Sequence, residues 1–306
     1  MSADKPQPYR EISPAPSVTA LPVLVTSPHS GAFYPADFLA AAHLDDHAIR
    51  QSEDMYVGDL FCEAASKGVR MLEAVYPRAY VDLNRGAYEL EPALFDGQLP
   101  AHVDSKSPRA GSGLGTVPRL VAENKPIYNR KLQYAEAERR IETIYQPFHR
   151  RLAELLDNMH DAYGMAVLLD AHSMPSQAAR STHHLPASDA PEIDFVLGNR
   201  HGRSCHAGLT NWLRDFLTSH GYRVALNKPY AGGFITEHYG RPAKGFHALQ
   251  IEINRAIYMD EKAYRKHEGF ERLRALFGLM LNEIADNLPA LPTPSQSPDN
   301  GRSAAE

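Results

Sequence analysis

The sequence has little cysteine and no long apolar run. Only two cysteines, Cys62 and Cys205, occur among its 306 residues, so a disulfide framework is not indicated, and their spacing does not suit a thiolate metal site. An apolar run of about 18 residues, which a transmembrane helix would need, is absent. The chain begins with a polar, proline-rich stretch where a signal peptide would have an apolar core. We therefore expect a cytoplasmic protein.

Runs of basic residues are also missing. The 32 Lys and Arg are mixed among 37 Asp and Glu, giving a formal net charge of −5. Such a distribution offers no electrostatic footprint for nucleic acid. We expect a small-molecule partner, with neither nucleic acid nor membrane, and the sequence indicates no particular oligomeric state.

Composition along the chain predicts one folded domain. Residues 1–18 and 288–306 are rich in Pro, Ser and charge, so we expect both to be disordered and the domain to span 19–287. A chain of this size, with 43% hydrophobic residues, can bury a large core. Residues 91–126 are irregular and rich in Gly, Pro and Ser. They are too long for a connector, which favours a functional flap.

Short apolar runs alternate with helical patterns. The runs predict buried strands at 22–27, 70–75, 79–83, 165–170, 193–198, 222–226 and 247–253. Apolar residues spaced by three or four predict helices at 46–66, 141–159, 204–219 and 261–287, with Pro147 expected to break or kink the second. This order predicts an α/β fold: a single domain with a mostly parallel mixed sheet flanked by helices on both faces.

Two histidines follow predicted strands. His29 comes after 22–27 and His172 after 165–170. Since the carboxyl ends of parallel strands share one crevice, these side chains should converge. Asp170, two residues before His172 on an extended chain, would point to the same side and could orient its imidazole. Two such histidines favour zinc, although a turn histidine bonded to backbone is the simpler alternative for His29.

Catalytic zinc needs three protein ligands, commonly two histidines and one carboxylate. Asp54 and Glu53, in the predicted helix 46–66, are the carboxylates to test first as the third ligand. We prefer Asp54, and the competing interpretation is a solvated helix face.

Glu252 lies inside the apolar run HALQIEI, where a carboxylate is costly unless it is paired or functional. Burial would raise its pKa and suit it to act as a general base. A salt bridge with Arg255 or another arginine is the alternative.

Arginines gather near one predicted strand end. Arg78, Asn84 and Arg85, in PRAYVDLNR, offer guanidinium groups and an amide that match the carboxylates of an acidic substrate. Arg119 in the flap and Arg255 are further candidates for substrate binding. A surface arginine is an equally good interpretation of Arg119.

Long ordered motifs carry a family resemblance. The pieces SPHSG at 27–31, DLNRGAYELEPALFDGQLP at 82–100, DAHSMPS at 170–176 and LQIEINRAIYMDE resemble the N-formylglutamate amidohydrolase family. That family is in turn similar to zinc carboxypeptidases and aspartoacylase. The resemblance implies a zinc-carboxypeptidase-like fold and the hydrolysis of N-formyl-L-glutamate to formate and L-glutamate in histidine degradation.

The resemblance also implies roles for residues. His29 and His172 would bind one zinc ion per chain, Glu252 would be the general base for a metal-bound water, and the substrate would be held by Arg78, Asn84 and Arg85, with Arg78 also polarising its carbonyl. The wider group has a glutamate three residues after its first histidine, where this chain has Ala32. The third ligand is therefore not implied by the resemblance. The assignment of Asp54 is an inference from its place in the predicted helix that follows His29.

Two alternatives remain. One is a related metal-dependent deacylase acting on another N-acyl acidic amino acid. The other is a catalytically silent binding protein for acidic metabolites.

Overall fold

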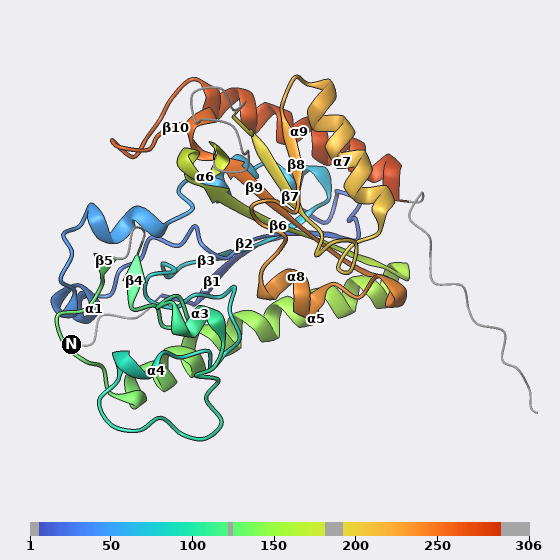
Figure 1. Cartoon of the computed structure of the whole chain (residues 1–306). Coiled ribbons are helices and arrows are strands. Elements are labelled where there is room, and N and C mark those ends of the chain that lie inside the picture. Colours follow the sequence, from blue (N-terminus) through green and yellow to red (C-terminus); the bar gives the residue numbers. More distant parts are fainter. Residues whose placement is uncertain (1–5, 122–124, 181–191, 289–306) are drawn as a thin grey trace, which may run out of the picture.

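A seven-stranded mixed sheet forms the centre of the computed structural model, which describes residues 6–121, 125–180 and 192–288 (Figure 1). Its spatial order is β1 (Tyr9–Ile12), β3 (Arg70–Ala74), β2 (Val23–Ser27), β6 (Ala166–Met174), β9 (Phe246–Asn254), β7 (Phe195–Gly198) and β8 (Val224–Leu226). Four of its six strand pairs are parallel, and β1–β3 and β7–β9 are antiparallel. The prediction of a mostly parallel mixed sheet is confirmed.

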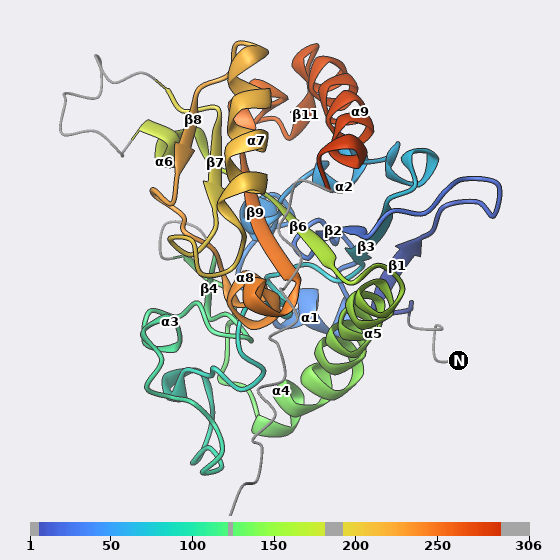
Figure 2. The same ribbon diagram turned by 90° about the vertical axis from the view of Figure 1, so that its right-hand side faces the viewer.

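Helices cover both faces of this sheet (Figures 1 and 2). One face packs against α4 (Tyr134–Arg140) and α5 (Gln146–Tyr163), and the other against α7 (Ala207–Ser219) and α9 (Gly269–Asn287). Alternate strand residues supply the two cores, so that Leu24 lies with α5. The shorter helices are α1 (Ala36–Ala41), α2 (Val57–Leu60), α3 (Pro108–Gly111), α6 (Ser176–Arg180) and α8 (Phe234–Tyr239). Among the described residues, none of the helices has both the length and the apolar character needed to cross a membrane.

The amphipathic segment around Pro147 is helical throughout. A π-helical turn, Ile141–Tyr145, joins α4 to α5 without a break. Pro147 is the second residue of α5 and therefore lies inside a continuous helix. The expected break is therefore absent. A π turn just before Pro147 adjusts the helical hydrogen bonds around it.

Two predicted elements differ from the structure. Residues 79–83 form turns, with Tyr80 and Val81 both donating to the Pro77 carbonyl, and their apolar side chains fill the core beneath α5 without pairing in the sheet. Residues 46–66 are not one helix but η1 (Ala48–Ser52), α2 and the start of η2 (Ala64–Lys67). Asp54 lies in the turn between η1 and α2, where its N–H donates to the His29 carbonyl at 3.0 Å.

The disorder predicted for residues 1–18 is wrong at β1. This strand pairs antiparallel with β3, and its Glu11 accepts from Arg151 of α5 at 2.7 Å. The polar composition of this segment suggested disorder, but its charged side chains form ion pairs that hold it as a short edge strand. Residues 289–306 of the predicted tail lie outside the described residues.

The predicted flap, residues 91–126, carries short elements. These are η3 (Pro92–Leu94), α3, and a hairpin of β4 (Leu120–Val121) and β5 (Lys125–Pro126), with 122–124 outside the described residues. Its role as a functional flap stays a prediction. A second small hairpin joins β10 (Met259–Asp260) to β11 (Arg265–Lys266).

Candidate active site

One face of the central strands changes from apolar to polar along its length. On β6, Leu168 packs in the core beneath α5, and Asp170 and His172 follow on the same face. On β9, Gln250 and Glu252 are their register partners, Gln250 beside Asp170 and Glu252 beside His172. All four polar side chains are buried. Two parallel strands thus set a compact polar layer toward the carboxyl ends of β6 and β9.

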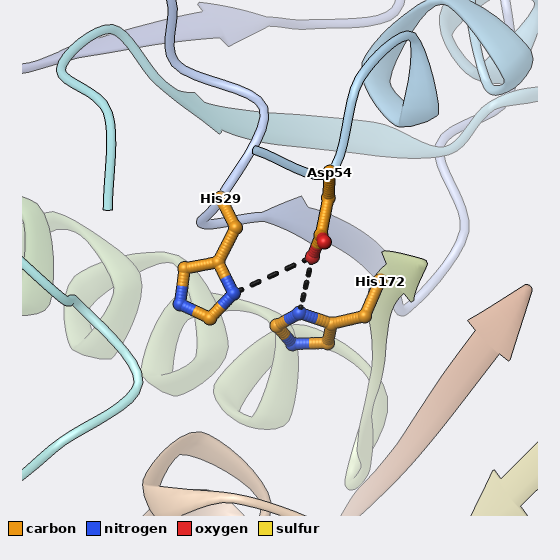
Figure 3. Close-up of side chains that lie close together, drawn as sticks. All are labelled: His29, Asp54 and His172. Carbon is orange, nitrogen blue, oxygen red and sulfur yellow. Dashed lines mark hydrogen bonds and ion pairs between the residues drawn. The ribbon is translucent and has the colours of Figure 1, made fainter. Parts of the chain in front are cut away.

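His29, Asp54 and His172 converge at this layer (Figure 3). His29 leaves the end of β2, His172 projects from β6, and Asp54 comes from the turn before α2. Asp54 Oδ2 lies 3.0 Å from His172 Nδ1 and 3.4 Å from His29 Nδ1. The three side chains are at most 3% exposed. Their ligand atoms all lie within 4.8 Å of one another, so the group could hold a metal ion.

The donor set fits a small divalent cation. Ligands about 2.0 Å from a tetrahedral zinc are separated by about 3.3 Å, close to the distances that join Asp54 to each imidazole. His29 Nδ1 is buried and has no hydrogen-bond partner in the described part of the chain. A buried nitrogen without a hydrogen-bond partner is costly unless something else binds it. Two imidazoles and one carboxylate also match a common catalytic zinc set.

Each imidazole is held from behind by another carboxylate. His29 Nε2 is hydrogen-bonded to Asp82 Oδ1 at 2.7 Å, and His172 Nε2 lies 3.0 Å from Asp170 Oδ2. Asp170 accepts in turn from Thr26 Oγ1 at 2.9 Å. Both rings therefore turn Nδ1 toward Asp54, the arrangement by which outer carboxylates orient metal-binding histidines. The expected placement of Asp170 beside His172 is confirmed.

The carboxylates of the group are ionised. Burial alone would raise the pKa of Asp54, but the neighbouring His172 and His29 hold it well below its usual value. Burial acts in the same way on Asp82, and there Arg78, Arg85 and His29 lower the pKa well below its usual range. The negative charge of these carboxylates, close to His29 Nδ1, favours the binding of a cation.

Asp54 and its neighbour Glu53 point to different partners. Glu53 accepts from Tyr34 Oη at 2.6 Å and from Arg50 Nε at 2.9 Å, away from the histidines. The outer oxygen of Asp54, Oδ1, accepts from Arg255 Nη2 and Ser173 Oγ, each at 3.1 Å. Of the two candidate carboxylates, only Asp54 joins the histidines.

Glu252 lies beside this group with a perturbed pKa. It is 8% exposed, and burial raises the pKa of its carboxyl to about 7. Its Oε1 accepts from Gln250 Nε2 at 2.8 Å. The alternative salt bridge with Arg255 is not formed, since that guanidinium bonds to Ser173, to the Gln51 carbonyl and to Asp54.

Arg78 and Arg85 both approach Asp82. Arg78 Nη2 donates to Asp82 Oδ2 at 2.8 Å, and Arg85 Nη2 lies 3.6 Å from the same oxygen. Burial would lower the pKa of Arg78, but the charges of Asp82, Asp54 and Glu252 raise it. Arg78 therefore lies within electrostatic range of both the ligand group and Glu252.

All five substrate-binding candidates have protein partners, since Arg85 also donates from Nε to the Leu114 carbonyl and from Nη1 to the Asn84 carbonyl, each at 2.8 Å. Asn84 Oδ1 accepts from the Ile235 N–H at 2.8 Å, and its Nδ2 lies 3.2 Å from His172 Nε2. Arg255 supports Asp54, as described above. Arg119, in the flap segment, donates to Glu91 at 2.6 Å and is not brought to the histidines by any described contact.

Two residues of the site were missed in the sequence. Asp82 stands two residues before Asn84 in DLNR, and Gln250 stands two before Glu252 on β9. The period of two that places Asp170 beside His172 would also have placed Gln250 beside Glu252. Asp82 lies in a turn, where that period does not apply.

Comparison with known proteins shows the family to which this chain belongs. The profile of the family N-formylglutamate amidohydrolase matches residues 21–259. N-formylglutamate deformylases from Pseudomonas putida and Pseudomonas aeruginosa are each 31% identical over 79% of this chain, and over 83% and 84% of their own. The crystal structure of N-formylglutamate amidohydrolase from Ralstonia eutropha is 36% identical, with a TM-score of 0.85 over 92% of this chain and 99% of that one. The chain belongs to the N-formylglutamate amidohydrolase family.

Proposed function

We propose that this protein hydrolyses N-formyl-L-glutamate to formate and L-glutamate, as a step of histidine degradation, with one zinc ion held by His29, Asp54 and His172. The observation that carries the proposal is the buried His29–Asp54–His172 group with Glu252 on the adjacent strand position. Family membership supports the substrate, because the relatives at 31% identity are named N-formylglutamate deformylases. The partner is a small metabolite, and we keep the cytoplasm as the expected compartment.

The chain would hold the cation through one nitrogen of each imidazole and one oxygen of Asp54. When bound, zinc supplies a Lewis acid that polarises the formyl carbonyl and lowers the pKa of water toward neutrality. Asp82 and Asp170 keep the rings in place from the far side. Arg255 and Ser173 hold the other oxygen of Asp54, so its carboxylate cannot rotate freely.

Glu252 would move the proton. As a carboxylate it takes a proton from the attacking water, and the new carbon–oxygen bond forms at the formyl carbon. The proton then passes to the amide nitrogen as the carbon–nitrogen bond breaks, which releases formate and the amine of glutamate. A pKa raised to about 7 by burial suits a group that must both accept and return a proton near neutral pH.

Two guanidinium groups would bind the substrate. Arg78 lies within electrostatic range of Glu252 and Asp54, where it can stabilise negative charge that develops on the carbonyl oxygen. Arg85 is the candidate partner for a substrate carboxylate, since it lies next to Arg78 around Asp82.

Formate release by the purified, zinc-loaded protein tests the function directly. N-formyl-, N-acetyl- and N-succinyl-L-glutamate should be compared at equal concentration, with metal content measured on the same sample. We expect turnover of the formyl compound that stops on chelation and returns with zinc. Faster release from another acyl group would replace the proposed substrate. A protein without metal and without turnover, which still binds the acidic substrate, would be a silent binding protein.

A further inference from the structure

We propose that Gln250 is a positioning residue that fixes the carboxylate of Glu252 and ties it to the first turn of α8. Its side chain connects the backbone of that turn to the proposed general base. The inference rests on the proposed function, because it concerns the group that would move the proton. Nothing in the reaction needs the amide of Gln250 to touch the substrate.

Hydrogen bonding determines how the amide is oriented. The Gly233 N–H, just before α8, donates to Gln250 Oε1 at 2.8 Å. A backbone N–H can only donate, so the amide oxygen must face it and the NH₂ group must face the other way. There, Nε2 donates to Glu252 Oε1 at 2.8 Å. Gln250 is 3% exposed, so water does not readily replace either bond.

Two glycines allow the backbone to come this close. Gly198 of β7 is the register partner of Gln250, and a Cβ there would lie 2.7 Å from the Ala231 carbonyl carbon. A Cβ on Gly233 would lie 2.4 Å from the amide of Asn84. Both distances are too short for a side chain, so the loop before α8 reaches Gln250 only because these positions are glycine.

The same turn is also connected to the ligand group. The Ile235 N–H, in α8, donates to Asn84 Oδ1, and Asn84 Nδ2 lies 3.2 Å from His172 Nε2. Two buried side-chain amides therefore accept from one turn of backbone: that of Gln250 donates on to Glu252, and that of Asn84 lies against the ring of His172. The turn thus adds to the strand register that already places the proposed base beside a proposed metal ligand.

Loss of this connection should affect rate more than binding. Without Gln250, one oxygen of a buried carboxylate loses its donor, and Glu252 is free to choose another rotamer. A general base works only within hydrogen-bond reach of its proton. Substrate binding by the arginines and cation binding by the histidines do not involve Gln250, so neither should change.

The test is Gln250→Met in the full-length, zinc-loaded protein with N-formyl-L-glutamate. Methionine fills a similar volume but can neither accept from Gly233 nor donate to Glu252. We expect kcat to fall about 10- to 100-fold, the usual cost of losing an outer-shell partner, with KM and zinc content unchanged. Thr210→Val is the matched control: it removes a buried hydroxyl in α7 that bonds Asn199, and it should leave kcat unchanged.

An unchanged kcat in Gln250→Met would overturn the inference, and so would an equal loss in Thr210→Val. If Gln250→Met does not fold, Gln250→Leu, which also lacks both hydrogen-bonding groups, should lower kcat in the same way. Glu252→Gln separates the two ideas. If it is inactive while Gln250→Met is normal, the inference fails and the function stands. If Glu252→Gln keeps full turnover, the base assigned in the proposed function is wrong.

Discussion

His172 on β6 and Glu252 on β9 are register partners in the central parallel pair of the sheet. Their side chains point to the same face, so the proposed ligand and the proposed base are neighbours before any loop is arranged. The chemistry is thus anchored in the most extensively paired part of the fold. Loops bring only Asp54, His29 and the arginines to it.

Glu252→Gln should retain zinc and lose turnover. The amide cannot take a proton from water, although it can still accept from Gln250. We expect kcat to fall at least about 100-fold, the lower bound for losing general-base catalysis. Zinc content and formate release are measured on the same sample, and normal turnover in the zinc-loaded variant would remove Glu252 from the mechanism.

Asp54→Asn and Glu53→Gln form a matched pair of buried, adjacent carboxylates. Asp54→Asn should lose zinc on dialysis, because it removes the one carboxylate that joins His29 and His172 within the described part of the chain. Glu53→Gln should keep zinc, since Glu53 bonds Tyr34 and Arg50 instead. Elemental analysis of the two variants decides the third ligand. The opposite pattern would make Glu53 the ligand.

Asp82→Asn should weaken metal binding without touching a ligand. Its negative charge orients His29 and is stabilised by Arg78 and Arg85. We expect zinc affinity to fall about 10- to 100-fold, as for other outer carboxylates of metal-binding histidines. Chelator competition measures this. Glu91→Gln, which removes the carboxylate partner of Arg119 in the flap segment, is the control that should leave affinity unchanged.

Arg85→Lys should raise KM more than it lowers kcat. Lysine keeps the charge but lacks the planar guanidinium, whose Nε and Nη1 bond the Leu114 and Asn84 carbonyls and so fix Nη2 for a substrate carboxylate. Losing one charged hydrogen bond costs about 1.5–3 kcal/mol, which corresponds to a KM about 10- to 100-fold higher. Steady-state kinetics with N-formyl-L-glutamate measure the split. A normal KM in Arg85→Lys, with a raised KM in Arg119→Lys, would move the carboxylate site into the flap segment.

His149 should make stability fall in weak acid. Burial lowers its pKa from 6.5 to about 4, and the ring bonds the Leu83 carbonyl and Tyr239 Oη. Between these two pKa values the unfolded chain binds a proton that the folded protein does not. The free energy of unfolding therefore decreases as the pH is lowered from 6.5 to about 4, by about 1.4 kcal/mol per pH unit from this group.

His149→Gln should remove that contribution. From pH 6.5 to pH 5 the wild type should lose about 2 kcal/mol more unfolding free energy than the variant. Urea titrations of both proteins at the two pH values measure the difference. Parallel losses in both proteins would show that His149 is protonated in the folded state.

Much of the sheet was predictable because apolar runs and periods of two survive in buried strands. The same period correctly placed Asp170 beside His172. It misled at 79–83, where apolar side chains fill the core from a turn, since burial alone does not reveal a backbone partner. β1 escaped notice for the opposite reason: an edge strand held by ion pairs has polar composition.

The sequence predicted which residues form the site better than it predicted the partners that their side chains contact. From the sequence we predicted a site of His29, His172 and a carboxylate. Which carboxylate faces the histidines, Asp54 or Glu53, depends on the conformation of the turn that follows η1. Arg255 was expected at the substrate, which stays a prediction, and the structure shows that it also supports Asp54. A guanidinium can reach many partners, so composition and spacing do not fix the one it takes.

The alternating faces of β6 and β9 also guard against misfolding. If β6 slipped by one position, Ala171 would occupy the place of His172, and Asp170 and His172 would enter the aliphatic core beneath α7 and α9. Burying such groups without partners costs several kcal/mol, so the slipped pairing is strongly disfavoured. Asp170 and His172 therefore also help to specify the register of β6 against β9. In the register that folds stably, these two residues already face Gln250 and Glu252.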